Sequence, residues 1–276
     1  MVNKTLYISD LDGTLLNSEK TISDYSRAAL NNMVDAGLNF TVATARSFKS
    51  ALKILDLLKL PYPVILMNGA LLYDTDSCSF VNVETVSAPE NITELFNAYS
   101  ASAFMYAFDC GNINIYYENL DTPSLLKFYD DRRDTYGKNF FKTENLSDTA
   151  LLRNVIYFTL FDRHEKLSGL YNELKKLPGI TAILYKDVYY DDYWYLEIYS
   201  EKASKYHAAL YIKDCYNFQQ LVGFGDNLND IPLLEACDEF YAVKGAVPEL
   251  KSLAKAVIGD YNEDGVVKKI QELFGK

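Results

Sequence analysis

The stretch TLYISDLDGTLLN, residues 5–17, joins an apolar segment to a turn that carries two acidic residues. Its first half contains the short run LYI, which is typical of a strand buried in a parallel sheet. Asp10 and Asp12 follow directly, and Gly13 allows the backbone to leave the strand sharply. Two carboxylates so close together repel each other unless a positive charge lies beside them. The stretch therefore predicts a buried strand that ends next to a positively charged group.

The residues that follow alternate between helix and strand patterns. Ser23 can cap a helix that ends at Gly37. A strand is then predicted at 38–46, a second helix at 47–60 and a third strand at 63–70. This order predicts an α/β fold, with a Rossmann-like core of parallel strands and helices on both faces of the sheet.

Polar residues fall where the first three predicted strands end. They are Asp10, Thr44 and Asn68. Because ligands of open α/β sheets bind at the carboxyl ends of the strands, we expect a site on this edge.

A different pattern begins near residue 83. A helix is predicted at 88–101, and the strands that follow are rich in Tyr, Phe and Ile, which favours a smaller α+β unit with an antiparallel sheet. These strands are FMYAFD, INIYYE, NVIYFTLF, ITAILY and YWYLEIY. From about residue 204 the first pattern resumes. We therefore predict a core of residues 1–82 and 187–276, interrupted by an inserted domain at 83–186.

The composition excludes several classes of protein. A net charge of −11 and a pI of about 4.7 argue against nucleic acid or an anionic membrane as the main partner. No run approaches the roughly 18 apolar residues needed to span a bilayer, and the first residues contain no signal-peptide core. The four cysteines are scattered without a CxxC pair. We expect a cytoplasmic protein with reduced, mostly buried thiols.

A second acidic cluster, VGFGDNLND at 222–230, also follows an apolar strand. If this strand lies beside the opening strand, Asp10, Asp12, Asp226 and Asp230 converge on one edge of the sheet. Four carboxylates in one place require a cation, since their repulsion otherwise raises their pKa values. Oxygen ligands suit a hard divalent ion, and Mg2+ is common where the substrate supplies phosphate oxygens.

Two other kinds of site can be excluded. An EF-hand needs glycine at loop position 6 and glutamate at position 12, and loops that start at Asp10 or Asp226 have neither. The chain also lacks a GxxxxGK[ST] phosphate loop, and GFGDNL lacks the third glycine of a dinucleotide fingerprint.

Four segments together resemble the motifs of the haloacid dehalogenase superfamily. In chain order they are DLDGTL, Thr44 in TVATAR, Lys205 in ASKYHAAL, and GDNLND. The NGA that follows the third strand, the insertion between the second and third motifs, and the ending YNEDGVVKKI look like those of the Cof-type phosphatases of that superfamily. The resemblance covers nearly the whole chain, although the insertion matches only in size and character.

The resemblance implies catalytic roles for four residues. Asp10 would attack a phosphomonoester and form an aspartyl-phosphate. Asp12 would protonate the departing alkoxide and later deprotonate the hydrolytic water. Thr44 would hydrogen-bond the phosphoryl group, and Lys205 would offset negative charge on it and on Asp10.

The resemblance also implies a Mg2+ site. Asp226 would bind the ion together with Asp10 and the backbone carbonyl of Asp12, with Asp230 in support. Asp230 can alternatively serve only as the N-cap of the next helix.

Two of these assignments have rivals of the same residue type nearby. Thr41 lies on the same strand as Thr44, but Thr44 stands at its end. Lys202 lies close to Lys205, but Ser204 directly before Lys205 matches the family pattern.

Arg46 and Asn68 are candidates for substrate binding. The family usually has Thr-Gly-Arg at this point, whereas this chain has Ala45 in place of the glycine. This change leaves the hydroxyl of Thr44 intact but restricts the backbone before Arg46. Asn68 ends a predicted strand and could equally be part of a plain turn.

We therefore predict a Mg2+-dependent phosphatase of small phosphorylated metabolites, such as sugar phosphates or a cofactor phosphate, with no nucleic-acid or membrane partner. An aspartate at position 12 favours a phosphatase or a phosphomutase over family members that displace halide or transport ions. A phosphomutase and a non-catalytic regulator that binds a phosphometabolite remain alternatives, and the oligomeric state is open.

Overall fold

The computed structural model describes residues 4–109, 111–120, 122–136, 139–187 and 192–275. The chain forms two compact units. The core unit contains the residues up to Asn82 and those from Ala203 onward, and the inserted unit is Val83–Lys202.

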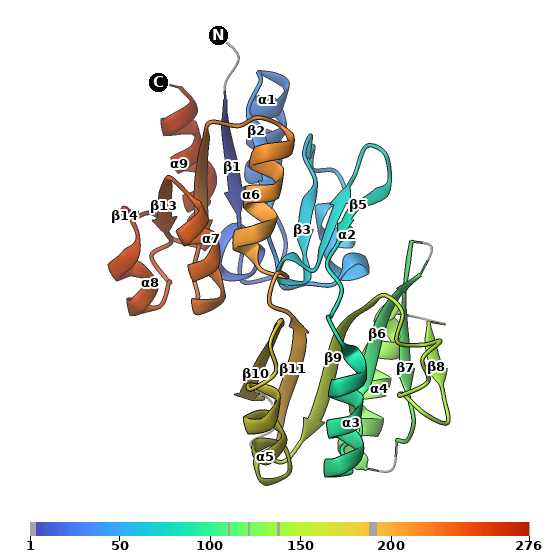
Figure 1. Cartoon of the computed structure of the whole chain (residues 1–276). Coiled ribbons are helices and arrows are strands. Elements are labelled where there is room, and N and C mark those ends of the chain that lie inside the picture. Colours follow the sequence, from blue (N-terminus) through green and yellow to red (C-terminus); the bar gives the residue numbers. More distant parts are fainter. Residues whose placement is uncertain (1–3, 110, 121, 137–138, 188–191, 276) are drawn as a thin grey trace. The chain divides into compact units, whose positions relative to one another are not determined.

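The core unit is built on a five-stranded sheet in the order β14-β13-β12-β1-β2, whose neighbouring strands are all parallel (Figure 1). The strands are β1 (Thr5–Ser9), β2 (Asn39–Val42), β12 (Gln220–Gly225), β13 (Glu239–Ala242) and β14 (Ala256–Val257). Ser9 lies opposite Phe224 on one side and Val42 on the other. The residues that directly follow β1 and β12 therefore meet at the same edge, and the predicted parallel core is confirmed.

Helices lie on both faces of this sheet, α6 and α7 on one face and α1 and α9 on the other. The helices of the core unit are α1 (Asp24–Asp35), α2 (Phe48–Leu55), α6 (Lys205–Cys215), α7 (Ile231–Ala236), α8 (Pro248–Leu253) and α9 (Gly265–Phe274). The side chain of Ser23 accepts a hydrogen bond from the backbone N–H of Ser26, so the predicted cap of α1 is present.

The third predicted strand forms, but it makes only a single bridge to the parallel core sheet. β3 (Val64–Leu66) is joined to the core sheet by one parallel bridge between Ala43 and Ile65. It belongs to a three-stranded sheet with β4 (Leu71–Asp74) and β5 (Ser79–Val83), a pair that the sequence analysis did not predict.

The inserted unit contains a six-stranded sheet in the order β10-β11-β9-β6-β7-β8. Its strands are β6 (Phe104–Asp109), β7 (Asn112–Tyr117), β8 (Phe140–Lys142), β9 (Val155–Asp162), β10 (Ile180–Lys186) and β11 (Trp194–Ser200). The pairs are antiparallel except β7–β8, which is parallel.

Three helices accompany this sheet: α3 (Pro89–Tyr99), α4 (Pro123–Tyr136) and α5 (His164–Leu174). Apolar residues of α3 and α5 form one core cluster with Met105 and Phe158. The ring of Phe128 in α4 stacks on Phe104 at a centroid distance of 4.5 Å. Because successive side chains of a strand point to opposite faces, α4 packs on the face opposite to α3 and α5.

Two expectations need correction. The inserted unit does not end at residue 186, because β11 pairs with both β9 and β10 and the unit therefore extends to Lys202. The described cysteines are not mostly buried, since Cys78 and Cys215 are exposed and Cys237 is partly exposed. Cys110 lies outside the described residues.

Candidate active site

Asp10 directly follows the central strand β1. Its backbone N–H donates to the carbonyl of Phe224 at 3.0 Å, which ties it to β12. The residue is only 4% exposed. A carboxylate in such a position loses most of its hydration, so its partners decide its charge state.

Lys205, the first residue of α6, is the main partner of Asp10. Its Nζ donates to Oδ1 of Asp10 at 2.6 Å and to Oδ1 of Asp230 at 2.7 Å. The whole residue is 1% exposed, whereas the rival Lys202 is exposed. Ser204 caps α6 by accepting from the N–H of His207, which fixes the start of the helix where Lys205 stands.

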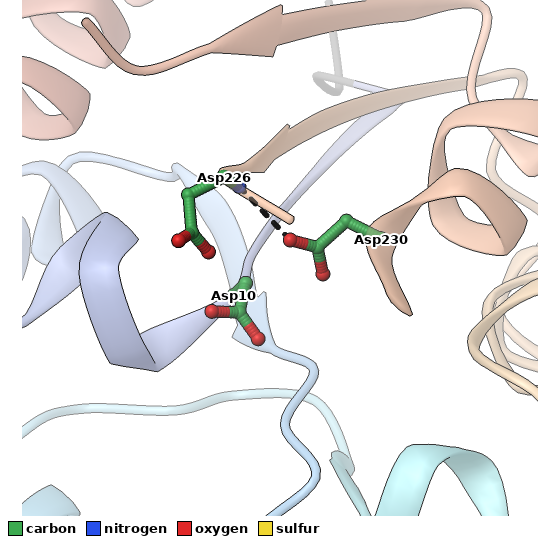
Figure 2. Close-up of side chains that lie close together, drawn as sticks. All are labelled: Asp10, Asp226 and Asp230. Atoms are coloured by element: carbon green, nitrogen blue, oxygen red, sulfur yellow. Dashed lines mark hydrogen bonds between the residues drawn. The ribbon is translucent and has the colours of Figure 1, made fainter. Parts of the chain in front are cut away.

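Three carboxylates converge at this edge of the sheet (Figure 2). Oxygen atoms of Asp10, Asp226 and Asp230 lie within 4.8 Å of one another. Oδ2 of Asp230 accepts from the backbone N–H of Asp226 at 2.9 Å and of Asn227 at 3.2 Å. Because Oδ1 of Asp230 is also engaged by Lys205, Asp230 holds the site together, whereas Asp10 and Asp226 present the more available oxygens.

The turn after β1 shapes the space around Asp226. Gly13 has a φ of +76°, and a Cβ there would lie 2.5 Å from Oδ2 of Asp226. Any other residue at this position would therefore both strain the backbone and collide with the carboxylate. The hydroxyl of Thr14 donates to Oδ1 of Asp226 at 3.3 Å. Thr14 was not predicted as a site residue, although it is the threonine of the DGT motif.

The electrostatics of the cluster are unbalanced. Burial and the nearby Asp230 raise the pKa of Asp10 to about 8, although Lys205 opposes the shift. Burial and Asp230 likewise raise the pKa of Asp226 to about 6. Burial lowers the pKa of Lys205, but Asp10 and Asp230 raise it more, so this ammonium group stays charged. Among the described residues one ammonium and three carboxylates form this cluster, which therefore has two excess negative charges when all three carboxylates ionise.

This donor set fits a hard divalent cation. Carboxylate oxygens are the ligands such an ion prefers. A positive charge beside Asp10 and Asp226 would also lower their pKa values again. Asp10, Asp226 and Asp230 are thus residues that could hold a metal ion.

The carboxylate of Asp12 lies outside the three-carboxylate group found among the described residues. It forms a two-point ion pair with Arg46, in which Nε donates to Oδ2 at 2.6 Å and Nη2 to Oδ1 at 2.5 Å. The Asp12 side chain is 49% exposed. The predicted convergence of four carboxylates therefore involves three side chains.

Thr44 and Asn68 lie next to each other at neighbouring strand ends. Thr44 is 1% exposed, and its carbonyl accepts from the N–H of Asn68 at 3.0 Å. Oγ1 of Thr44 accepts from the N–H of Arg46 at 3.1 Å, so its hydroxyl hydrogen remains available for another group. The rival Thr41 instead donates to the carbonyl of Pro63 at 2.8 Å.

Asn68 has an unusual environment. Its φ is +54°, and its Oδ1 is a buried atom without a hydrogen-bond partner among the described residues. A buried carbonyl oxygen of this kind costs free energy unless a donor reaches it. The Oδ1 of Asn68 can therefore accept a hydrogen bond from a further donor.

The family follows from a comparison that spans the motifs described above. A model of the haloacid dehalogenase-like hydrolases matches residues 7–270. The chain belongs to this family. The predicted membership is confirmed, and with it the prediction of an enzyme of the phosphatase type.

Full-length relatives support the same assignment. The 5-amino-6-(5-phospho-D-ribitylamino)uracil phosphatase YwtE of Bacillus subtilis is 28% identical over 96% of each chain. The pyridoxal phosphate phosphatase YbhA of Escherichia coli is 26% identical over 95% of each chain. A Thermotoga maritima protein of known crystal structure superposes with a TM-score of 0.78 at 23% identity, over 97% of this chain and 96% of that one, and shows the same fold.

Among the residues that the structure describes, none of the helices has both the length and the apolar character that a membrane span requires.

Proposed function

We propose that this haloacid dehalogenase-like hydrolase is a Mg2+-dependent phosphatase that removes phosphate from small phosphorylated metabolites through an aspartyl-phosphate on Asp10. The observation that carries the proposal is the buried Asp10 carboxylate, held by Lys205 at 2.6 Å beside Asp226. This arrangement combines a nucleophile, a fixed positive charge and oxygen ligands for a cation.

The first half of the reaction forms the phosphorylated enzyme. Lys205 engages Oδ1 of Asp10, so we assign the attack on phosphorus to Oδ2. The bond from phosphorus to the leaving oxygen breaks, and Asp12 gives that oxygen a proton. Lys205 and the Thr44 hydroxyl stabilise the negative charge on the transferring group.

The second half releases phosphate. Asp12, now a carboxylate, takes a proton from water, and the oxygen of that water attacks phosphorus and restores Asp10. Mg2+ held by Asp10, Asp226 and the backbone carbonyl of Asp12 would supply positive charge that favours ionised Asp10 and offsets the phosphoryl oxygens. Asp230 holds Lys205 in place through both steps.

The substrate class rests on the relatives. Two of them act on phosphorylated compounds of low molecular mass, according to their names. We propose a sugar phosphate or a cofactor-related phosphate for this chain, with the inserted unit acting as a cap that contacts the leaving group and excludes water. Neither nucleic acid nor a membrane is proposed as a partner, and we propose a cytoplasmic location.

The test is phosphate release from a panel of sugar, pyridoxal and nucleotide phosphates, with Mg2+ or with a chelator. Asp10→Asn should lose at least about 1,000-fold in kcat, because the amide cannot act as the nucleophile. The control is Asp24→Asn, an exposed aspartate of the same unit. Release that survives in Asp10→Asn would overturn the proposal.

Two alternatives predict different products. A phosphomutase would return the phosphoryl group and give an isomerised phosphate ester instead of free phosphate. A regulator would bind a phosphometabolite with no turnover.

A further inference from the structure

The ion pair of Asp12 and Arg46 differs from the surface ion pair of Asp24 and Arg27 in the same unit. The guanidinium meets the carboxylate through two parallel hydrogen bonds, one to each oxygen. In the surface pair of Arg27 and Asp24, a single contact joins neighbouring turns of one helix, and the aspartate side chain is 94% exposed. A two-point pair restricts the orientation of a carboxylate far more than a single contact does.

Arg46 is itself held from three sides. Its Nη1 donates to Oγ of Ser50 at 3.2 Å, in the first turn of α2. Its backbone N–H donates to Oγ1 of Thr44 at 3.1 Å, and its carbonyl accepts from the N–H of Met67 at 3.1 Å. Its side chain is 20% exposed, against 49% for Asp12. The guanidinium is therefore the fixed partner and the carboxylate is the group that it orients.

We infer that Arg46 is a positioning residue that holds the Asp12 carboxylate in the orientation from which it exchanges protons with the leaving oxygen and with water. The inference rests on the proposed function, because it assumes that Asp12 is the acid and base. A half-exposed aspartate has several rotamers, and the pair selects one of them. Each oxygen of a carboxylate has two lone pairs, so the pair with Arg46 leaves one on each oxygen for a proton.

The same geometry argues against Arg46 as a ligand of the substrate phosphate. An arginine binds phosphate through two parallel hydrogen bonds from one edge of the guanidinium. Here the edge formed by Nε and Nη2 faces Asp12, and Nη1 faces Ser50. The substrate-binding role expected from the sequence would require this arrangement to break.

The inference predicts a dependence on the leaving group. An alkyl phosphate releases a strongly basic alkoxide that needs the proton of Asp12, whereas p-nitrophenyl phosphate releases a weakly basic phenolate that hardly needs it. Loss of Arg46 should therefore resemble loss of Asp12. A phosphate ligand would instead affect both substrates alike and raise KM.

The experiment compares Asp12→Asn, Arg46→Gln and the double variant on the best alkyl phosphate of the panel and on p-nitrophenyl phosphate, in Mg2+. Arg46→Gln should lower kcat/KM for the alkyl phosphate by about 100-fold, and for p-nitrophenyl phosphate by less than about 10-fold. The double variant should be no worse than Asp12→Asn, because a positioning residue has no effect once its target is gone. Arg27→Gln is the matched control and should keep wild-type rates.

Two further variants guard against a folding defect. Arg46→Lys keeps the charge but loses the two-point pair, so it should show the same preference for the good leaving group. Ser50→Ala removes only the brace of Arg46 and should show a weaker form of the same pattern. Equal losses on both substrates, or effects of Asp12→Asn and Arg46→Gln that multiply, would overturn the inference. If that happens while Asp10→Asn is inactive, the proposed function still stands; an active Asp10→Asn would overturn both.

Discussion

Two carboxyl groups, one in each unit, are shielded from water to different extents: Asp10 is buried and Glu197 is half-buried. Asp10 ends a strand of the core unit and faces one ammonium and two further carboxylates. Glu197 lies in the middle of β11 in the inserted unit, where its Oε1 accepts from the hydroxyl of Tyr185 at 2.9 Å and Tyr157 supplies a second hydrogen bond. Burial raises the pKa of both groups.

The difference lies in the charge of their surroundings. Glu197 accepts hydrogen bonds from the hydroxyls of Tyr157 and Tyr185, and the positive charge of Arg132 also lowers its pKa. The rings beside it pair across strands, as Tyr157 and Tyr199 do at 5.3 Å. The surroundings of Asp10 contain more negative charge than Lys205 can offset. A carboxylate with hydroxyl donors and a cation nearby needs no ligand, whereas one among excess negative charges calls for a cation. Residual charge, more than burial, therefore distinguishes the surroundings of Asp10 from those of Glu197.

The largest effect should come from removing the ammonium of the core cluster. Lys205→Met leaves Asp10 and Asp230 buried without their counterion, which should lower the free energy of unfolding by about 3–5 kcal/mol in a chelator. Denaturant unfolding measures this change. Lys213→Met on the same helix is the control, because the pair of Lys213 with Asp238 is partly exposed and should contribute less than about 1 kcal/mol. A Lys205→Met protein as stable as the wild type would show that the carboxylates there are not charged.

A second prediction separates the two acids by their response to Mg2+. Binding to the folded protein alone should stabilise the wild type by about 2.7 kcal/mol at 100 times Kd. Asp226→Asn should lose most of this gain because it removes a proposed ligand, and Glu197→Gln should keep it. Thermal unfolding with Mg2+ or with a chelator measures both. An undiminished response in Asp226→Asn would contradict the proposed site.

A smaller effect is expected from the hydroxyls around Glu197. Tyr185→Phe removes a donor from its carboxylate and should cost about 1 kcal/mol of unfolding free energy. Water can partly replace that donor, because Tyr185 is 40% exposed. Tyr99→Phe, an exposed tyrosine of the same unit, should be neutral. Equal stabilities of Tyr185→Phe and Tyr99→Phe would mean that Glu197 does not depend on this hydroxyl.

The smallest effect is a pH dependence that belongs to Glu197. Its pKa is raised above the ordinary 4.5 by burial, against the hydrogen bonds from the two tyrosines. A folded-state pKa above the unfolded one means that the contribution to stability is full below pH 4.5 and is lost as the pH rises through the folded pKa. The free energy of unfolding of the wild type should therefore fall relative to Glu197→Gln as the pH rises from below 4.5 through the folded-state pKa. A constant difference across these pH values would show that Glu197 is not shifted.

Much of the core and of its edge was predictable from the sequence. An apolar run that ends in acidic residues occurs twice, and two such strands in one parallel sheet place their ends together, as β1 and β12 do. The family pattern favoured Lys205 over Lys202, and the strand end favoured Thr44 over Thr41. In the structure Lys205 is the residue that contacts Asp10, whereas Lys202 is exposed. The proximity of Asp10 and Asp226 follows from the strand order, and Asp230 joins them through its hydrogen bonds with the backbone of Asp226 and Asn227.

The features that the sequence did not predict depend on contacts between distant residues or on weak patterns. The pair of Asp12 and Arg46 depends on the exact path of the turn at Gly13, which no periodicity encodes. Cys78 is exposed because it lies in the turn between β4 and β5. These two strands, which follow the apolar run of β3, were not predicted from the sequence. The end of the inserted unit was misplaced because β11 can be assigned only by its partners β9 and β10.

The strand order of the core sheet has a consequence for how the enzyme is made. β1 and β12 are adjacent, although Thr5 pairs with Gln220 across most of the chain. Synthesis proceeds from the N-terminus, so Asp10 emerges long before Asp226 and Asp230, and the inserted unit is complete in between. During synthesis β1 therefore lacks its neighbour β12 until the last quarter of the chain has been made. The candidate site is therefore complete only after Asp230 has been made, and a chain released before that point would carry Asp10 without one of the carboxylates beside it.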